Sequence, residues 1–206
     1  MKTVLCFGDS NTFGYNPVDG TRYPESIRWS GILKQNLKEE YNVIEAGCNN
    51  RTCFIDNPDG IEQTGYKILS KYLTKSVDIL IIALGINDIQ KFYNPTLSEI
   101  KDGVEKIILL AKEINKNIKI ILVSPSTLSN DVLKGYFAFQ HDKQSIEKSF
   151  KMAEIYKAAA IKFNCEFIDL AKCVTVSKTD GLHYDEAEHK KIATIIENKI
   201  KAINLT

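Results

Sequence analysis

The sequence predicts an α/β protein in which helices cover both faces of a five-stranded parallel sheet. Short apolar runs rich in β-branched residues alternate along the chain with longer segments of helical periodicity. The run at residues 79–84 is apolar at every position, as is typical of a central strand with helices on both sides. The chain has 206 residues, 44% of them hydrophobic, which is enough for one domain over residues 1–206.

The strands are expected where the apolar runs occur, at residues 3–7, 42–46, 77–84, 119–123 and 165–170. Helical segments separate these runs, at residues 27–41, 60–75, 97–115, 145–163 and 186–203. Because a helix follows each strand, neighbouring strands are expected to be parallel and joined by right-handed crossovers. Within the last helical segment, His189 stands beside two charged residues, and we expect it on a solvated face.

Composition and charge exclude several classes of protein. Lysine and arginine number 27 and acidic residues 26, a net charge of +1 that argues against nucleic-acid or polybasic membrane binding. No apolar run is long enough to span a membrane, and the apolar stretch near the N-terminus is too short for a signal peptide. The five cysteines are an odd number, so we expect reduced thiols in a cytoplasmic protein.

In such a fold, ligands bind in the loops after the carboxyl ends of the strands. These loops are residues 8–15, 47–58, 85–91, 124–144 and 171–184. The fourth is long for an α/β connection and is expected to form a pocket wall or a lid. Its aromatic residues are predicted either to line a pocket or to fold back on the core; they are Tyr136, Phe137 and Phe139.

Three of these loops carry residues suited to acyl chemistry. Ser10 follows the first strand and is either a nucleophile or part of a helix cap. Asn87 follows the third strand and is either an oxyanion donor or a turn residue. Asp180 precedes His183 by three residues, a spacing that lets the carboxylate orient an imidazole base. The sheet edge brings the three together as nucleophile, oxyanion donor and oriented base.

The same residues carry a resemblance. The segments 8–15, 85–88 and 180–183 resemble, in order and spacing, the first, third and last signature blocks of the SGNH (GDSL) hydrolase family. The resemblance implies a flavodoxin-like α/β/α sandwich, ester hydrolysis through an acyl-serine, and no cofactor or metal. Ser10 matches the nucleophile and His183 the general base, with Asp180 orienting it. Asn11 stands where the family name has leucine.

The second block is less regular. Its usual glycine, whose backbone N–H binds the oxyanion, aligns with Asn50, with Gly47 as the competing position. The oxyanion hole is therefore expected to consist of the N–H groups of Ser10 and Asn50 and the side chain of Asn87. Residues 26–33, 43–47 and 51–52 are similar to the aryl-esterase and acyltransferase branch of the family. Asp9 and Trp29 are candidates for substrate binding, although a helix tryptophan is more commonly core.

The predicted function is hydrolysis of small acyl esters, with acyl transfer as a side activity. The expected partner is a small-molecule ester, with no nucleic acid, membrane, cofactor or metal; that branch is often oligomeric, which makes a homo-oligomer plausible. Cys48 and Cys53 lack the companions that a zinc site needs. The alternative is a flavodoxin-like module whose first loop binds a phosphate or nucleotide without hydrolysis.

Overall fold

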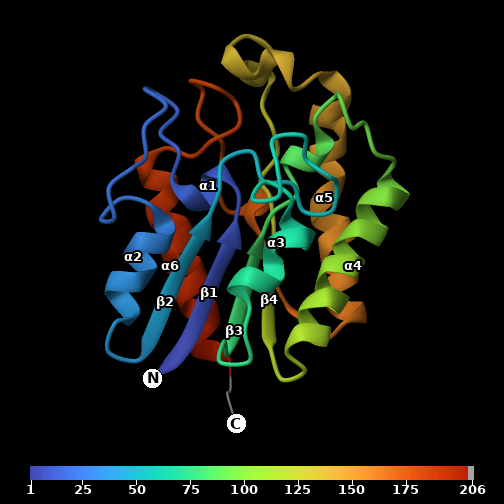
Figure 1. Ribbon diagram of the computed structural model, residues 1–206. Helices are drawn as coiled ribbons and strands as arrows, with labels where there is room; N and C mark the ends of the chain where they lie inside the picture. Colours follow the sequence, from blue (N-terminus) through green and yellow to red (C-terminus); the bar gives the residue numbers. More distant parts are fainter. Residues whose placement is uncertain (204–206) are drawn as a thin grey trace.

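The computed structural model describes residues 1–203 and has three layers, with helices on both faces of a parallel sheet (Figure 1). The sheet has the strand order β2-β1-β3-β4-β5, which confirms the predicted fold class. Its strands are β1 (Lys2–Gly8), β2 (Tyr41–Gly47), β3 (Ile79–Ala83), β4 (Lys119–Ser124) and β5 (Glu166–Asp169). Residues 204–206, the end of the expected domain, lie outside the described residues.

Two apolar cores fill the space between the layers. Along β1, the side chains of Val4 and Cys6 belong to one core and those of Leu5 and Phe7 to the other, because successive strand residues face opposite sides. The first core packs under α2 (Trp29–Leu37) and α6 (Glu186–Ala202). The second packs under α3 (Gly65–Tyr72), α4 (Leu97–Ile114) and α5 (Lys143–Lys162).

Local sequence signals start the two longest helices. Thr96 caps α4 and exchanges hydrogen bonds with Glu99, and Asp142 caps α5 in the same way with Ser145. Both caps satisfy backbone N–H groups that the first helical turn leaves free. None of the helices within residues 1–203 is long and apolar enough to cross a membrane.

The prediction for His189 is wrong. Its side chain is fully buried rather than solvated, although its neighbours in the sequence are charged. The buried face of α6 passes through His189, Ile192, Ala193 and Ile196, which recur at helical spacing. The ring Nδ1 of His189 accepts a hydrogen bond from the backbone N–H of Trp29 at 3.3 Å, which ties α6 to the start of α2.

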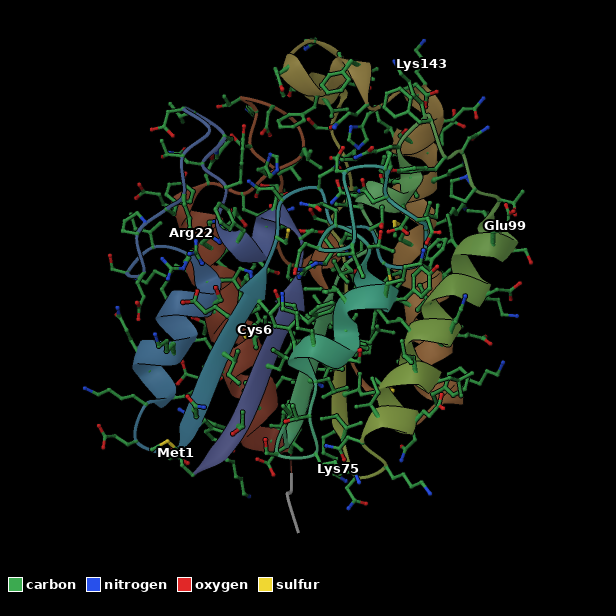
Figure 2. The ribbon with its side chains drawn as sticks, in the orientation of Figure 1. Met1, Cys6, Arg22, Lys75, Glu99 and Lys143 are labelled. Carbon is green, nitrogen blue, oxygen red and sulfur yellow. The ribbon has the colours of Figure 1, made fainter. Side chains whose placement is uncertain are left out.

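The carboxyl ends of β1, β2 and β3 lie side by side at one edge of the sheet, and the candidate site lies at this edge. Gly8 pairs with Gly47 of β2 and with Ala83 of β3, so the loops after these three strands begin side by side. The order of the strands reverses between β1 and β3, where ligands bind in sheets of this type. Lys143 lies near this edge, and Met1 and Lys75 lie at the opposite one (Figure 2).

Two short 3-10 helices, η2 (Asn130–Leu133) and η3 (Tyr136–Phe139), rise above the carboxyl ends of the strands (Figure 1). They belong to the long loop at residues 124–144 that follows β4.

Candidate active site

The loop after β1 presents Ser10 at the sheet edge. Asp9 caps the short helix α1 (Ser10–Phe13), because its Oδ1 accepts a hydrogen bond from the N–H of Asn11 at 2.9 Å. A Cβ atom at Gly8 would lie 1.9 Å from Oγ1 of Thr12, so the tight turn into α1 needs glycine there. Ser10 thus begins a helix immediately after a strand and lines the cavity above the sheet.

Ser10, His183 and Asp180 form a continuous hydrogen-bonded line. The Oδ2 atom of Asp180 lies 2.6 Å from Nδ1 of His183, and Nε2 of His183 lies 2.9 Å from Oγ of Ser10. An ionised carboxylate only accepts hydrogen bonds, so Nδ1 carries the proton and Nε2 is left to accept the hydroxyl of Ser10. All three side chains are buried.

The Asp180 carboxylate is held in its charged form. Burial raises the pKa of Asp180, but the hydrogen bonds from the ring and the backbone N–H of His183, and from the N–H of Leu182, outweigh burial. The pKa of Asp180 therefore lies below its ordinary value. An ionised Asp180 can both fix the imidazole tautomer and stabilise an imidazolium.

Two aromatic rings hold the imidazole of His183 in place. The ring of Tyr15 lies 4.2 Å from the imidazole, centroid to centroid, at an interplanar angle of 30°. The ring of Phe137 lies 5.0 Å from it at an angle of 60°. The imidazole is packed between Tyr15, which follows α1, and Phe137 of η3. These contacts restrict its rotation away from Ser10.

The loop after β2 is anchored by a buried arginine. The guanidinium of Arg51 donates hydrogen bonds to the carbonyl oxygens of Gly8 at 3.1 Å, Ala46 at 2.5 Å and Glu62 at 2.8 Å. It also lies over the ring of Phe7, 4.7 Å from the centroid. The next residue back, Asn50, lines the cavity and has a left-handed backbone with φ of 60°, a conformation that asparagine tolerates better than most residues.

The loop after β3 brings Asn87 to the same cavity. Asn87 starts the 3-10 helix η1 (Asn87–Ile89), and its Nδ2 donates to the carbonyl of Arg51 at 3.0 Å. The adjacent Asp88 accepts the backbone N–H groups of Cys53, Phe54 and Ile55 at 2.6 to 3.1 Å. Complete burial raises the pKa of Asp88 to about 7 despite these bonds. The two loops are therefore fastened to each other.

The cavity above Ser10 has a volume of about 530 Å³ and a wall rich in aromatic rings. The long loop after β4 supplies part of that wall, through Tyr136, Phe137 and Phe139. All three residues line the pocket, and Phe137 also packs against the core, so it shows both of the arrangements that the sequence left open. Tyr136 is 76% exposed and Phe139 is 50% exposed, so this part of the wall forms the rim.

Asp180 does not line this cavity and lies behind His183, and Asp9, Trp29 and Gly47 also lie outside it. Asp9 and Trp29 line a small separate cavity of about 20 Å³ behind α1, and the indole Nε1 of Trp29 donates to the carbonyl of Asn11 at 3.1 Å. Burial raises the pKa of Asp9 to about 7. Gly47 lies against α1, where a Cβ atom would approach the N–H of Phe13 to 2.2 Å.

Sequence reasoning assigned no role to Tyr15, Arg51 or Gln90. Tyr15 and Arg51 stand inside the segments compared with the family blocks, but their contacts join loops far apart in the chain. Gln90 is 2% exposed and lines the cavity, three residues after Asn87. The spacing of three residues between Asn87 and Gln90 could have been recognised in the sequence, because in a 3-10 helix it places both side chains on one face.

Within residues 1–203, no group of three or more His, Cys, Asp or Glu side chains is placed to hold a metal ion. Cys48 and Cys53 are free thiols, and burial raises the pKa of both.

Comparisons with known proteins identify the family of this chain. The family model described as GDSL-like Lipase/Acylhydrolase matches residues 6–191. A carbohydrate acetylesterase from Sinorhizobium meliloti is 29% identical over 98% of this chain and 99% of that one, with a TM-score of 0.87. The aryl esterase of M. smegmatis is 28% identical over 99% of this chain and 100% of that one, also with a TM-score of 0.87. No match is found among curated proteins.

The chain therefore belongs to the GDSL-like lipase/acylhydrolase family. With esterases as its structural neighbours over nearly the whole chain, it is a carboxylic-ester hydrolase of the SGNH type.

Proposed function

We propose that this enzyme hydrolyses esters of small acyl groups through an acyl-enzyme on Ser10. The observation that carries the proposal is the hydrogen-bonded line from Asp180 through His183 to Ser10, with heavy-atom distances of 2.6 and 2.9 Å. These distances lie within the reach that general-base activation of a hydroxyl requires.

In the proposed first step, Oγ of Ser10 attacks the ester carbonyl while Nε2 of His183 takes the hydroxyl proton. The carbonyl π electrons move to the oxygen, which becomes an oxyanion. When the tetrahedral intermediate collapses, the bond to the alcohol oxygen breaks, and the imidazolium returns the proton to that oxygen. In the second step, water attacks the acyl-serine by the same route and releases the acid.

The N–H groups of Ser10 and Asn50 and the side-chain amide of Asn87 are proposed to stabilise the oxyanion. The support is their common cavity: all three residues line the space above the sheet edge. Gly47, the competing position, packs under α1, which favours Asn50 as the second backbone donor. Asp9 and Trp29 are proposed to support the nucleophile from behind, since they contact α1 and not the cavity that contains Ser10.

Acetyl-like esters of ring-bearing alcohols are the proposed substrates. The aromatic rim offers flat apolar faces to a ring, and the structural neighbours are described as an aryl esterase and a carbohydrate acetylesterase. The phosphate-binding alternative lacks comparable support, because the hydroxyl of Ser10 points to an imidazole base. A cytoplasmic location and a homo-oligomer stay predictions.

The proposal is tested by Ser10→Ala, which is expected to lower kcat by about 10⁴-fold or more because covalent catalysis is lost. Ser70→Ala, on the exposed side of α3, is the matched control and should keep wild-type turnover. A serine-directed phosphonate should add its mass to the peptide that contains Ser10. Labelling at another residue, or full activity of Ser10→Ala, would contradict the assignment.

A further inference from the structure

A chain of side-chain amides connects the loop after β2 with η1. Nδ2 of Asn50 donates to Oδ2 of Asp59 at 2.5 Å, and Oδ1 of Asn50 accepts from Nε2 of Gln90 at 2.8 Å. The same Nε2 of Gln90 also donates to Oδ1 of Asn87 at 3.2 Å, and Nδ2 of Asn87 donates to the carbonyl of Arg51 at 3.0 Å. We call the side chains of Asp59, Asn50, Gln90 and Asn87 the amide relay.

The two ends of the amide relay give it one direction. An ionised carboxylate accepts hydrogen bonds and donates none, so Asp59 requires the NH₂ group of Asn50 to face it. The oxygen of Asn50 then faces Gln90, which must present its own NH₂ group. At the far end, the backbone carbonyl of Arg51 is also an acceptor and requires the NH₂ group of Asn87. Both ends therefore select the same orientation of all three amides.

This direction matters because an amide side chain has two nearly isosteric ends. If Asn87 turned over, its oxygen would face the acceptor of Arg51 and its nitrogen would face the NH₂ group of Gln90, so both contacts would become repulsive. In the observed orientation, one N–H bond of Nδ2 points to Arg51 and the second remains for a ligand in the cavity. Burial strengthens this selection, since Gln90 and Asn87 are 2% and 4% exposed.

The relay also holds the backbone of Asn50. Asn57 donates to the carbonyl of Asn50 at 2.7 Å, while the side chain of Asn50 is held at both ends by Asp59 and Gln90. A glycine at this position would adopt the φ of 60° more easily but would have no side chain to join the relay. The asparagine thus links the backbone donor of one loop to the side-chain donor of the other.

We propose that Gln90 is a positioning residue which, through the amide relay, aligns the N–H of Asn50 and the amide of Asn87 for the oxyanion. The inference rests on the proposed function, because it assumes that these two groups meet a developing negative charge. Preorganised donors lower a barrier because they need no reorientation when the charge forms. The contribution of Gln90 should therefore appear in kcat and leave KM nearly unchanged.

The first test is Gln90→Met, which keeps the length of the side chain and removes its donors. The expected result is a fall in kcat of about 10- to 100-fold with KM within about twofold of wild type, since the oxyanion donors remain but lose their fixed orientation. Gln144→Met, on the exposed face of α5, makes the same chemical change away from the cavity and should leave both constants unchanged.

The second test is Gln90→Glu, which has a signature that loss of packing does not produce. A protonated carboxyl donates one hydrogen bond and supports the relay in part, whereas an ionised one repels the oxygens of Asn50 and Asn87. Position 90 is buried, and burial raises the pKa of a carboxyl above its ordinary value of about 4.3 because it disfavours the charged form. The ratio of kcat/KM for the variant to that of wild type should therefore fall as pH rises from 5 to 9. The ratio removes the part of the pH dependence that both proteins share.

The outcomes separate the two claims. If Gln90→Met and Gln90→Glu both keep kcat within about twofold of wild type while Asn87→Ala loses about 100-fold, the relay is refuted and the proposed oxyanion hole stands. A flat ratio across the pH range also refutes the relay. If Asn87→Ala itself keeps full turnover, the oxyanion role of Asn87 and the relay fail together, although Ser10→Ala still tests the nucleophile on its own.

Discussion

The buried imidazole of His189 should make the stability of this protein depend on pH in a way that one substitution removes. Burial lowers the pKa of His189 from 6.5 to about 4, with the nearby charge of His183 adding to the effect. Its ring contacts Tyr23 and Tyr184 edge-on and accepts a hydrogen bond from the N–H of Trp29. None of these three partners is a carboxylate that would stabilise the protonated ring. The folded protein therefore favours the neutral ring.

The sign follows from proton binding. Between pH 6.5 and about 4, the unfolded chain takes up a proton at this histidine that the folded chain refuses. The contribution of His189 to the free energy of unfolding should fall in this window as pH is lowered, by up to about 1.4 kcal/mol per pH unit and on the order of 3 kcal/mol in total. Asp9 and Asp88 act in the opposite direction, because burial raises the pKa of each to about 7.

His189→Asn isolates the effect of the histidine. Oδ1 of an asparagine occupies about the same position as Nδ1 of the histidine. It can still accept a hydrogen bond from the N–H of Trp29, but the asparagine side chain does not titrate. Urea unfolding at pH 7, 6, 5 and 4 gives the free energy for each protein. The smaller side chain lowers stability at every pH. The informative quantity is therefore the slope of the free energy of unfolding against pH. The difference between wild type and variant should shrink as pH falls; parallel curves would refute the argument.

Three further predictions concern catalysis. Asn87→Ala should lower kcat by about 10²- to 10³-fold with little change in KM, whereas a variant that loses stability but keeps turnover would indicate a turn residue. Asp180→Asn should lower kcat by about 10⁴-fold and alter the dependence of kcat/KM on pH, because the carboxylate that fixes the tautomer of His183 is gone; an unchanged profile and rate would exclude this pair as catalytic. Acetyl to butyryl esters should be hydrolysed faster than dodecanoyl esters, because the loop at residues 124–144 leaves little sequence for a deep acyl tunnel; a higher kcat/KM for dodecanoyl would contradict this.

The sequence was sufficient to predict the sheet and the level at which its strands end. Apolar runs marked all five strands, and the rule that ligands bind at the carboxyl ends selected the loops of Ser10, Asn87 and His183. The structure brings these three residues to one cavity. This part succeeds because strand periodicity and strand order are properties of contiguous segments.

The contacts between loops were not predictable in the same way. Gln90 meets Asn50 across 40 residues of sequence, and Tyr15 packs on His183 from the other end of the chain. Such pairs depend on the paths of loops, which no periodic pattern fixes. His189 was misjudged because its immediate neighbours are charged, whereas the burial of a helix residue is decided by residues three and four positions away.

The distance along the chain between Ser10 and His183 has a consequence for how activity arises. The two residues are 173 positions apart, with the proposed nucleophile just after the first strand and the proposed base just before the last helix. A ribosome-bound chain that has emerged only as far as β5 has its nucleophile but no base, and it cannot hydrolyse an ester by this route. Hydrolytic activity therefore reports completion of the whole sheet and its loops. Recovery of turnover during refolding should coincide with the slowest step of assembly and not precede it.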